Sequence, residues 1–587
     1  MAQKRAVKMA VPAQSDRPNV VGRNHAVSTG HYLATLAAMR VLDRGGNAID
    51  AGCTASMALS ILQPDMVSFA CVAPTLVYLK ELDRVVSLAG LGYWPKNTDV
   101  SRLIAEGGKH VPEGLLRTVM PAAPATYIEG LRRYGTISFE EAASPAMELA
   151  KNGFATYPLL ASNIDYLEAS FRRWPDNQKI FLSRGRAPRV GELFVQEDLS
   201  RTIARLIQAE RDCRGDRDKK LRAVHDYFYR GPIAREIADY HAKNGGFVTF
   251  DDLAGFEVPV EDSLSVSYRN DYTVHSCDVW CQGIVLLETL KTLEGYDLKA
   301  MGHNSPDYTH TVVEALNLAF ADREAYVGDP KFVHVPTKAL ISDAYAVRQR
   351  GRIDMSRAFG KLPEPGDPEN SGRKVSGAAE KAYAAPHGGS RLSQDTIYAC
   401  IVDRQGNAYS ATTSDNSSET PIIPGTGLAI SSRGCQSRLE PGHPAEVKPG
   451  KRPRLTPNPA LAFRDGKLLM AFGTPGGDQQ SQAMLQVFLN IVEHGMTVQQ
   501  AVEAPRMSSQ SFPNSFAPHG YFPGRMNMEE NMPRETIEDM RRRGHDVEIW
   551  PRYPAANAGV CAVKVDPDTG MRHAGADPRR EGYAMAW

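Results

Sequence analysis

The sequence DTIYACIVDRQGNAYSATTS, residues 395–414, decides the fold. Apolar and small residues alternate through its first nine positions and again through its last seven, which is the pattern of β-strands. The QGN segment between the two runs has the composition of a tight turn. The stretch therefore predicts a hairpin whose first strand starts at Asp395 and Thr396.

The chain immediately before this hairpin has a different character. Residues 363–394 are rich in glycine, proline, serine and charge, and they contain almost no apolar anchor. Such a composition is typical of a flexible surface segment, because it offers little apolar surface to bury. We predict an exposed linker over residues 363–395 that runs directly into a rigid strand.

Helices and strands are predicted on both sides of the linker. Residues 32–62 have a helical pattern that is broken at GGNAID, residues 45–50, where the glycines suit a helix C-terminus and Asn47 suits an N-cap. Further predicted elements are a helix-rich region over 121–255, strands over 264–268 and 272–275, a helix over 305–326, a strand over 468–472 and a helix over 479–493. This order indicates an α/β protein in which helices cover a sheet, and the length of 587 residues allows two to four domains.

The composition excludes several classes of partner. Lys plus Arg and Asp plus Glu both total 68, so no bulk charge favours nucleic acid or an anionic membrane. The most apolar region, residues 57–79, is interrupted by Gln63, Pro64 and Asp65, which argues against a membrane span. We expect a soluble, unexported protein of the cytoplasm that binds neither nucleic acid nor membrane.

The cysteines and histidines do not indicate a metal site. The eight cysteines are scattered without a CxxC pair, which fits a reducing compartment better than a disulfide scaffold. Cys277 and Cys281 lack partners at zinc-site spacing. His310 and Glu314 lie four residues apart without an HExxH motif, so they are interpreted as a solvated or packed helix face. No metal and no cofactor are expected.

Thr396 stands where the predicted linker meets the strand. A threonine at the start of a strand is usually structural, because threonine favours β-structure. A catalytic role requires that the peptide bond before it be cut. The freed α-amine, with a pKa of about 7.7–8.0, would then be a base on the residue that carries the hydroxyl nucleophile. An exposed linker ahead of a fixed strand offers that geometry, which makes Thr396 a candidate nucleophile.

Gly476 and Gly477 lie in GTPGGD, between the predicted strand over 468–472 and the predicted helix over 479–493. Amides in such a turn can face a developing oxyanion, because no Cβ obstructs them. A plain strand-to-helix turn has the same sequence. The residues alone leave the two interpretations equally open.

Seven segments resemble landmarks of the γ-glutamyltransferase family and occur in that family's order. They are GGNAIDA at 45–51, EALNLAFADREAYVGDPKFVHVP at 314–336, the Asp-Thr pair at 395–396, VDRQGNA at 402–408, GTPGG at 473–477, EAPR at 503–506 and GADPRR at 575–580. The second segment is highly specific, because so long a string seldom arises by chance. The chain is identified as a member of that family over nearly its whole length.

The resemblance implies an α+β fold of the N-terminal-nucleophile hydrolase class, a four-layer αββα sandwich built from two fragments of one precursor. It implies self-cleavage between Asp395 and Thr396. The large fragment would be residues 1–395 and the small fragment residues 396–587, and the two would form a heterodimer, with a dimer of such heterodimers as a further option.

The resemblance also implies roles for individual residues. Thr396 would be nucleophile and base, and Ser414 would be the hydroxyl that hydrogen-bonds it. Asn416 would contact the substrate, and Gly476 and Gly477 would form the oxyanion hole.

The glutamate-binding positions depart from the family pattern. The arginine for the α-carboxylate falls on Leu91, the aspartate for the α-amine falls on Gln436, and the paired serines fall on Leu455 and Thr456. An ammonium facing Gln436 loses a charge-assisted bond worth about 1.5–3 kcal/mol. Arg433 stands where a neutral side chain is usual, and it offers a cation to a carboxylate from another wall.

We therefore predict a hydrolase that forms an acyl-enzyme on Thr396 and passes the acyl group of a small amide to water. The acyl group is predicted to differ from the standard γ-glutamyl group. Three alternatives stay open: true γ-glutamyl transfer or glutathione hydrolysis, a carbon–carbon-bond hydrolase of a biosynthetic pathway, and an unprocessed homologue without activity.

Overall fold

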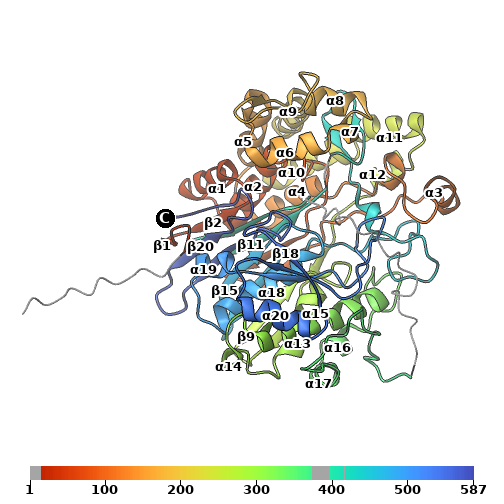
Figure 1. Ribbon diagram of the computed structural model, residues 1–587. Coiled ribbons are helices and arrows are strands. Elements are labelled where there is room, and N and C mark those ends of the chain that lie inside the picture. The colour runs from red at the N-terminus through yellow and green to blue at the C-terminus, as the bar shows by residue number, and fades with distance from the viewer. Residues whose placement is uncertain (1–14, 373–394, 416) are drawn as a thin grey trace, which may run out of the picture.

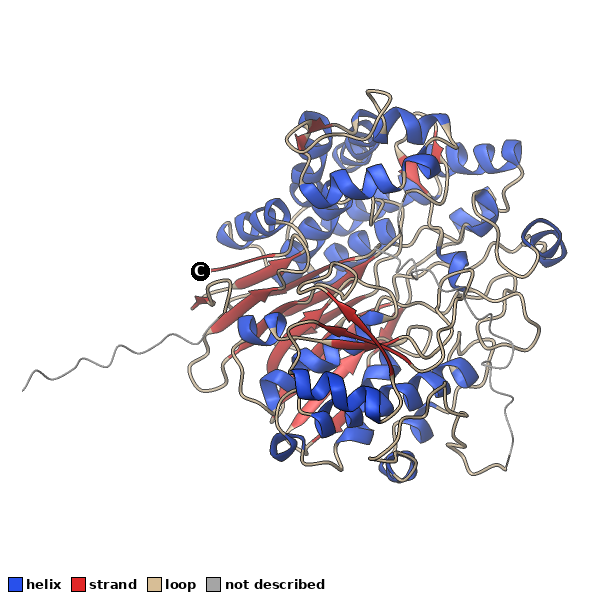
Figure 2. Cartoon of the chain, in the orientation of Figure 1, coloured by secondary structure: helices blue, strands red, loops and turns tan. Residues whose placement is uncertain are grey.

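Two seven-stranded β-sheets lie face to face in the computed structural model, with helices on both outer sides (Figures 1 and 2). The structure describes residues 15–372, 395–415 and 417–587. The strands within each large sheet pair antiparallel throughout. The arrangement is the four-layer αββα sandwich that the family resemblance implies.

We name the two large sheets after their central strands. The β10 sheet contains, in spatial order, β21 (Tyr583–Ala586), β2 (Ala26–Thr29), β10 (Ile397–Val402), β11 (Ala408–Thr413), β3 (Thr75–Leu79), β4 (Arg84–Leu88) and β7 (Val260–Asp262). The β15 sheet contains β1 (Val20–Gly22), β20 (Arg572–Ala576), β19 (Cys561–Val565), β15 (Lys467–Gly473), β14 (Ala460–Arg464), β9 (Tyr272–Ser276) and β8 (Leu264–Tyr268). Each sheet therefore combines strands from both sides of the Asp395–Thr396 junction.

Helices cover the outer face of each sheet. On the side of the β10 sheet lie α1 (Tyr32–Asp43), α2 (Ala48–Leu62), α4 (Ala123–Tyr134), α5 (Phe139–Asn152), α6 (Pro158–Tyr166), α7 (Glu168–Phe171), α8 (Pro175–Phe181), α9 (Glu197–Asp212), α10 (Arg217–Tyr229), α11 (Pro232–Asn244) and α12 (Phe250–Ala254). On the side of the β15 sheet lie α13 (Gly283–Leu293), α14 (Leu298–Met301), α15 (Pro306–Tyr326), α16 (Thr337–Leu340), α17 (Asp343–Arg350), α18 (Gln479–Val492), α19 (Val498–Glu503) and α20 (Arg534–Arg542).

Shorter elements complete the fold. They are α3 (Val100–Gly107), the 3-10 helices η1 (Leu115–Arg117) and η3 (Arg433–Gln436), and the small sheets β5 (Phe154–Ala155) with β6 (Leu193–Phe194), β12 (Ile422–Ile423) with β13 (Leu428–Ala429), and β16 (Met507–Ser509) with β17 (Arg525–Glu529) and β18 (Asp546–Trp550).

The predicted hairpin is confirmed as β10 and β11, paired from Ile397 with Thr413 to Val402 with Ala408. Every residue of both strands is buried, because the hairpin lies between a helix layer and the second sheet. Along β10 the side chains alternate: Ile397, Ala399 and Ile401 pack with the helices, and Tyr398, Cys400 and Val402 pack in the core between the sheets. Burial on both faces explains the nearly continuous apolar run in the sequence.

The break between the first two helices is also confirmed. Gly45 has a φ of 96°, which suits the residue that follows a helix end. The Asn47 side chain accepts hydrogen bonds from the amides of Ile49 (2.9 Å) and Asp50 (3.0 Å), and Asp50 accepts one from the amide of Asn47 (2.9 Å). This reciprocal cap starts α2, whose residues are all buried.

Gly366, in the part of the predicted linker that the structure describes, is attached to α15 and α17. The Gly366 amide donates to Asp322 of α15 (2.8 Å), and Tyr326 donates to the Gly366 carbonyl (2.7 Å). A Cβ at Gly366 would lie 2.0 Å from the Tyr345 hydroxyl, so the backbone is pressed against α17. Residues 373–394, the rest of the predicted linker before Asp395, lie outside the described residues.

Two further interpretations from the sequence concern residues away from the hairpin. His310 and Glu314 are buried, so they are packed and not solvated: His310 lies 3.0 Å from the His545 ring nitrogen, and Glu314 accepts from the Phe359 amide. All eight cysteines are unpaired thiols.

Within the ranges that the structure describes, no helix combines the length and apolarity needed to cross a bilayer.

Two buried carboxyl groups lie between α13, α15 and α17. Asp322 accepts from the Tyr345 hydroxyl (2.6 Å) and from the Gln349 amide (2.7 Å). Burial, and then the neighbouring Asp322 charge, raise the pKa of Glu288 well above its ordinary value. Burial and the Asp322 charge therefore favour the neutral acid form of Glu288.

A raised pKa makes Glu288 a pH-dependent element of stability. Its contribution is complete below the ordinary glutamate pKa of about 4.3 and is lost as the pH rises, by up to about 1.4 kcal/mol per pH unit. We expect Glu288→Gln to raise the thermal unfolding midpoint more at pH 8 than at pH 5. The exposed Glu364→Gln is the control. Equal shifts of the Glu288→Gln midpoint at both pH values would contradict the neutral-acid assignment.

Candidate active site

The register of the hairpin brings Thr396 and Ser414 together. Because Ile397 pairs with Thr413, residues 396 and 414 are the next pair outward. The Thr396 Oγ1 lies 2.6 Å from the Ser414 Oγ, and both residues are fully buried. Ser414 is fixed in turn by two backbone hydrogen bonds with Val72, of 3.0 and 3.2 Å. The structure thus joins the predicted nucleophile and its predicted hydroxyl partner.

The backbone at Thr396 is strained. Its φ is 84°, a region that β-branched residues rarely adopt and that costs on the order of 1–3 kcal/mol. The amide of Thr396 donates to the Met66 carbonyl (3.0 Å), which holds the strained geometry in place. The dihedral φ involves the carbonyl carbon of Asp395, so cutting the Asp395–Thr396 bond removes the constraint. The strain therefore lies at the residue whose preceding peptide bond is predicted to be cleaved.

Arg433, at the start of η3, contacts Asp395 of this junction and Ser414, the partner of Thr396. Its guanidinium donates to the Asp395 carboxylate and to the Ser414 hydroxyl. Its Nε lies 3.5 Å from an Asp415 oxygen. Burial opposes the charge, but the Asp395 and Asp415 carboxylates outweigh it and raise the pKa of Arg433. The structure therefore places a permanent cation next to the Ser414 hydroxyl, which in turn contacts the hydroxyl of the predicted nucleophile.

Asp415 is a site residue that the sequence reasoning missed. It accepts hydrogen bonds from the Ser432 amide (3.0 Å), the Ser432 hydroxyl (2.7 Å) and the Ser431 hydroxyl. Burial raises its pKa to about 6, although Arg433 and the two serines act in the other direction. It ties the segment before η3 to the end of the hairpin and so positions Arg433. Its position in the sequence, between the predicted site residues 414 and 416, could have identified it as a site residue.

Gly476 and Gly477 form the turn between β15 and α18. Their φ values of 121° and 57° are favoured by glycine, and a Cβ on Gly477 would lie 3.1 Å from the Phe516 ring. The Arg433 guanidinium lies over the Phe516 ring, with its Cζ atom 5.1 Å from the ring centroid. Among the described residues, neither glycine amide donates a hydrogen bond. The turn is therefore linked to Arg433 through Phe516, and both of its amides are available to bind an oxyanion. The role of these glycines as the oxyanion hole stays a prediction.

A buried polar network supports this turn from α13 and α15. Gln282 donates to the carbonyl oxygens of Gly477 (3.0 Å) and Thr456 (3.1 Å). Arg323 donates to Gln282 (2.9 Å) and to Asp478, the residue after the glycines. Arg323 belongs to the 314–336 segment, so this segment supports the glycine turn through Gln282 and Asp478.

The other predicted substrate residues differ in the contacts that they make. Gln436 and Thr456 bind each other reciprocally. The side-chain amide of Gln436 donates to the Thr456 hydroxyl (2.7 Å), and the backbone amide of Thr456 donates to the side-chain oxygen of Gln436 (3.1 Å). Leu91 is buried in the apolar core between the sheets, together with Leu455. Asn416 lies outside the described residues. The structure therefore brings Thr456 to the glycine turn through Gln282, and it leaves Leu91 as a core residue.

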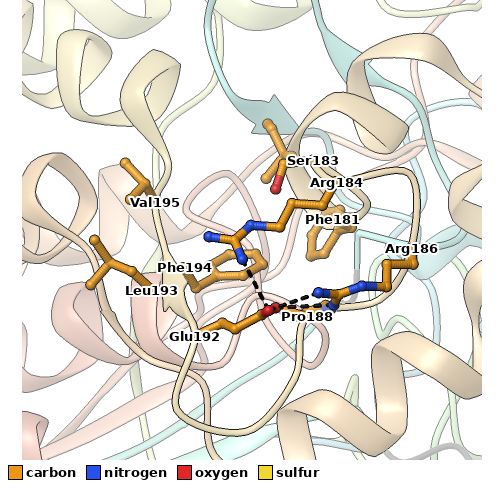
Figure 3. A pocket seen from close by; sticks show the side chains of 10 residues that line it. Phe181, Ser183, Arg184, Arg186, Pro188, Glu192, Leu193, Phe194 and Val195 are labelled. Carbon is orange, nitrogen blue, oxygen red and sulfur yellow. Dashed lines mark hydrogen bonds and ion pairs between the residues drawn. The ribbon is translucent and has the colours of Figure 1, made fainter.

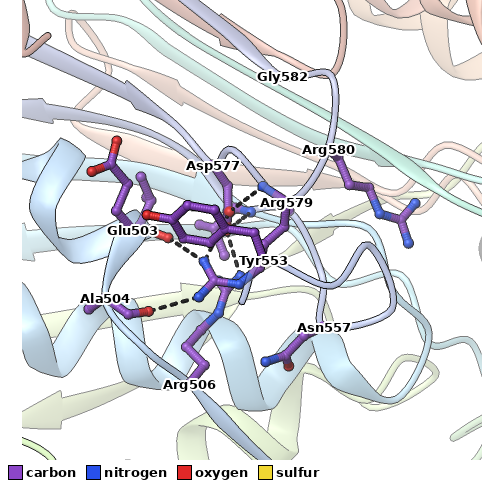
Figure 4. A network of polar contacts seen from close by, with 12 residues as sticks. Glu503, Ala504, Arg506, Tyr553, Asn557, Asp577, Arg579, Arg580 and Gly582 are labelled. Atoms are coloured by element: carbon purple, nitrogen blue, oxygen red, sulfur yellow. Dashed lines mark hydrogen bonds and ion pairs between the residues drawn. The ribbon is translucent and has the colours of Figure 1, made fainter. Parts of the chain in front are cut away.

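Arg580 is a second residue that the sequence reasoning did not single out. Figure 4 shows Arg579 inside a network with Asp577, while Arg580 points away from it. Its guanidinium lies 3.4 Å from the side-chain sulfur of Met66, the residue whose backbone carbonyl binds the Thr396 amide. Burial lowers the pKa of Arg580 to about 10, opposed by Asp395 first and then by Asp65. The presence of Arg580 in the GADPRR segment could have identified it from the sequence. This segment contributes a second cation near Asp395.

A concavity over residues 180–195 lies apart from these residues. Figure 3 shows Arg184 and Arg186 directed at Glu192, with bonds of 3.0 and 2.7 Å to one oxygen. The two arginines neutralise that carboxylate, and Ser183 is the hydroxyl on the lining. The lining contains none of the residues that gather around Thr396, so we assign the chemistry to the Thr396 centre.

A four-layer αββα sandwich with a threonine hydroxyl at the start of a central strand defines the class of N-terminal-nucleophile hydrolases. A family model described as Gamma-glutamyltranspeptidase matches residues 34–587. The chain belongs to the gamma-glutamyltranspeptidase family and is a hydrolase or acyltransferase of that family.

Individual relatives agree with this assignment. The Acylase ACY 1 proenzyme of Pseudomonas sp. (strain SE83) is 30% identical over 560 residues, which cover 93% of this chain and 91% of that protein. A cephalosporin acylase structure from Bacillus halodurans has a TM-score of 0.84 at 28% identity, covering 98% of each chain. A structure described as LmbA2991HD has a TM-score of 0.90 at 33% identity, covering 98% of this chain and 100% of that one. Other relatives include glutathione hydrolase and oxamate amidohydrolase proenzymes.

The short contact between Thr396 and Ser414 leads to a mutational prediction. Ser414→Ala removes a hydrogen bond to the nucleophile and is expected to lower kcat/KM about tenfold or more. Ser414→Thr keeps the hydroxyl and is expected to retain most activity. Thr413→Val is the matched control, because the Thr413 hydroxyl is buried without a partner among the described residues. Equal rates for Ser414→Ala and the parent in a steady-state assay would contradict the role of Ser414.

Proposed function

We propose that the chain is a self-processing amide hydrolase whose nucleophile is Thr396, released as the first residue of a small fragment. The observation that carries the proposal is the buried contact of Thr396 with Ser414, itself bound by Arg433. The strained φ at the junction and the proenzyme names of the relatives support cleavage before Thr396. Residues 1–395 and 396–587 would stay together as a heterodimer, since both large sheets contain strands from each.

Self-cleavage transfers the Asp395 acyl group from nitrogen to oxygen. The Thr396 hydroxyl oxygen attacks the Asp395 carbonyl carbon, the C–N bond breaks, and the freed Thr396 nitrogen takes up the proton. Water then hydrolyses the ester and leaves a carboxylic acid on Asp395. The product has an α-amine and a hydroxyl on one residue, which is the arrangement that nucleophilic catalysis needs.

The mature reaction repeats these steps on an external amide. The Thr396 amine accepts the hydroxyl proton as the oxygen attacks the substrate carbonyl, and that proton then leaves with the departing amine. The Gly476 and Gly477 amides stabilise the oxyanion. Water hydrolyses the acyl ester and restores the enzyme. No metal or cofactor takes part in these steps.

The acyl group that fits the site carries an anion and lacks the γ-glutamyl ammonium. Arg433 is a buried cation beside the nucleophile, and Gln436 is paired with Thr456 where an ammonium would need a carboxylate. The acylases among the relatives are consistent with an acyl group other than γ-glutamyl. We therefore favour a carboxylated acyl amide over glutathione.

We also propose a cytoplasmic location, supported by the eight unpaired thiols, seven of them buried. Cell fractionation of the native source should recover the protein with cytoplasmic markers. Recovery with secreted or periplasmic proteins would contradict this proposal.

The choice of acyl group is tested by two anilides that differ only in the α-amine. The purified enzyme should release p-nitroaniline from glutaryl p-nitroanilide about tenfold faster, by kcat/KM, than from γ-glutamyl p-nitroanilide, since the ammonium lacks a charge-assisted bond. A strong preference for the γ-glutamyl compound would show a true γ-glutamyltransferase.

A further inference from the structure

The Asp395 carboxylate occupies an anion site beside Thr396. One oxygen accepts from the Arg433 guanidinium, and the other accepts from the Thr396 hydroxyl at 3.1 Å. The side chains of Arg433 and Asp395 are 0% and 1% exposed. The scissile residue of the chain thus places its own carboxylate between the nucleophile and a buried cation.

Arg433 cannot easily move to follow a different ligand. Its guanidinium is held by the Ser414 hydroxyl on one side and lies over the Phe516 ring, 5.1 Å from the centroid. Phe516 is backed by Gly477, where even a Cβ would approach the ring to 3.1 Å. The position of the cation relative to Thr396 is therefore fixed by packing.

Arg433 also has donors to spare. Its Nε and Nη1 make no hydrogen bond with the residues that the structure describes. Asp415 lies 3.5 Å from Nε and balances part of the charge. If Asp395 leaves the site after cleavage, this buried cation loses its closest anion, which is costly unless another anion replaces it.

The geometry of Asp395 defines what that replacement is. In an aspartyl residue two carbons, Cα and Cβ, separate the peptide carbonyl from the side-chain carboxylate. The carbonyl of Asp395 is the group that Thr396 attacks during self-cleavage, and its carboxylate is the group that Arg433 binds. Carbonyl, two carbons and carboxylate is also the skeleton of a succinyl group.

We infer that the scissile Asp395 is an internal template of the substrate, and that the mature enzyme prefers succinyl-type amides, in which two carbons separate the reacting carbonyl from a carboxylate. The inference rests on the proposed function and names its substrate class. The Thr396 oxygen attacks the amide carbonyl, the amine leaves with a proton, and water converts the succinyl ester to succinate.

The same geometry orders other acyl groups. A glutaryl group carries its carboxylate one carbon further away, which a fixed Arg433 accommodates less well. A γ-glutamyl group has that longer spacing and adds an ammonium near Arg433. A neutral acyl group leaves the cation without an anion.

The test compares p-nitroanilides on the mature two-fragment enzyme. The substrates are the succinyl anilide, its succinamyl counterpart (in which a carboxamide replaces the carboxylate at equal size) and the glutaryl anilide. We expect kcat/KM for the succinyl compound to exceed that for the succinamyl compound about tenfold to a hundredfold, because a charge-assisted bond is lost. We expect it to exceed glutaryl by a smaller factor.

Substitution of the cation links the preference to Arg433. In Arg433→Gln the succinyl and succinamyl rates should become nearly equal, and in the exposed Arg464→Gln of β14 the parental ratio should persist. If Arg433→Gln fails to mature, the comparison of substrates on the parent enzyme decides alone.

The outcomes separate this inference from the proposed function. Equal turnover of the succinyl and succinamyl anilides, or faster turnover of the glutaryl compound, overturns the template while amide hydrolysis stands. Turnover of no anilide overturns the proposed function and the inference with it. A succinyl preference that Arg433→Gln abolishes supports both.

Discussion

The pairing register of β10 with β11 is the constraint on which the site depends. It sets residue 396 opposite residue 414 and leaves a 2.6 Å contact between their hydroxyl groups. Successive side chains of a strand point to opposite faces, so a slip of one residue would exchange the helix-facing and sheet-facing positions of β10. Both faces are buried, which makes such a slip costly. The core of the sandwich therefore enforces the alignment of the two hydroxyls.

Charge is the second organising element of the site. Arg433 and Arg580 approach the junction from η3 and from the segment after β20, and Asp395 is the anion that both face. Asp415 lies 3.5 Å from the Arg433 Nε in the uncut chain. In the uncut chain Asp395 faces both cations, and under the proposed cleavage they would become available to a ligand. Processing and substrate recognition are linked in this account because the same side chain, Arg433, serves both.

The local parts of the structure were predictable from the sequence, and the distant contacts were not. Alternation predicted the hairpin, and Asn47 predicted the start of α2, because each depends on residues within a few positions. The contact of Arg433 with Asp395 joins residues 38 apart, and Arg580 reaches the site from the other end of the chain. Periodicity holds no information about such pairs. Asp322 likewise anchors Gly366, inside the predicted linker, through a bond that composition could not indicate.

The central claim is that residue 396 becomes a chain terminus, so that base and nucleophile share one residue. Intact-mass spectrometry of an active preparation, with N-terminal sequencing of the smaller species, tests it most directly. We expect two species, one of which begins Thr-Ile-Tyr-Ala at residue 396. A single full-length species that retains full amidase activity would contradict it.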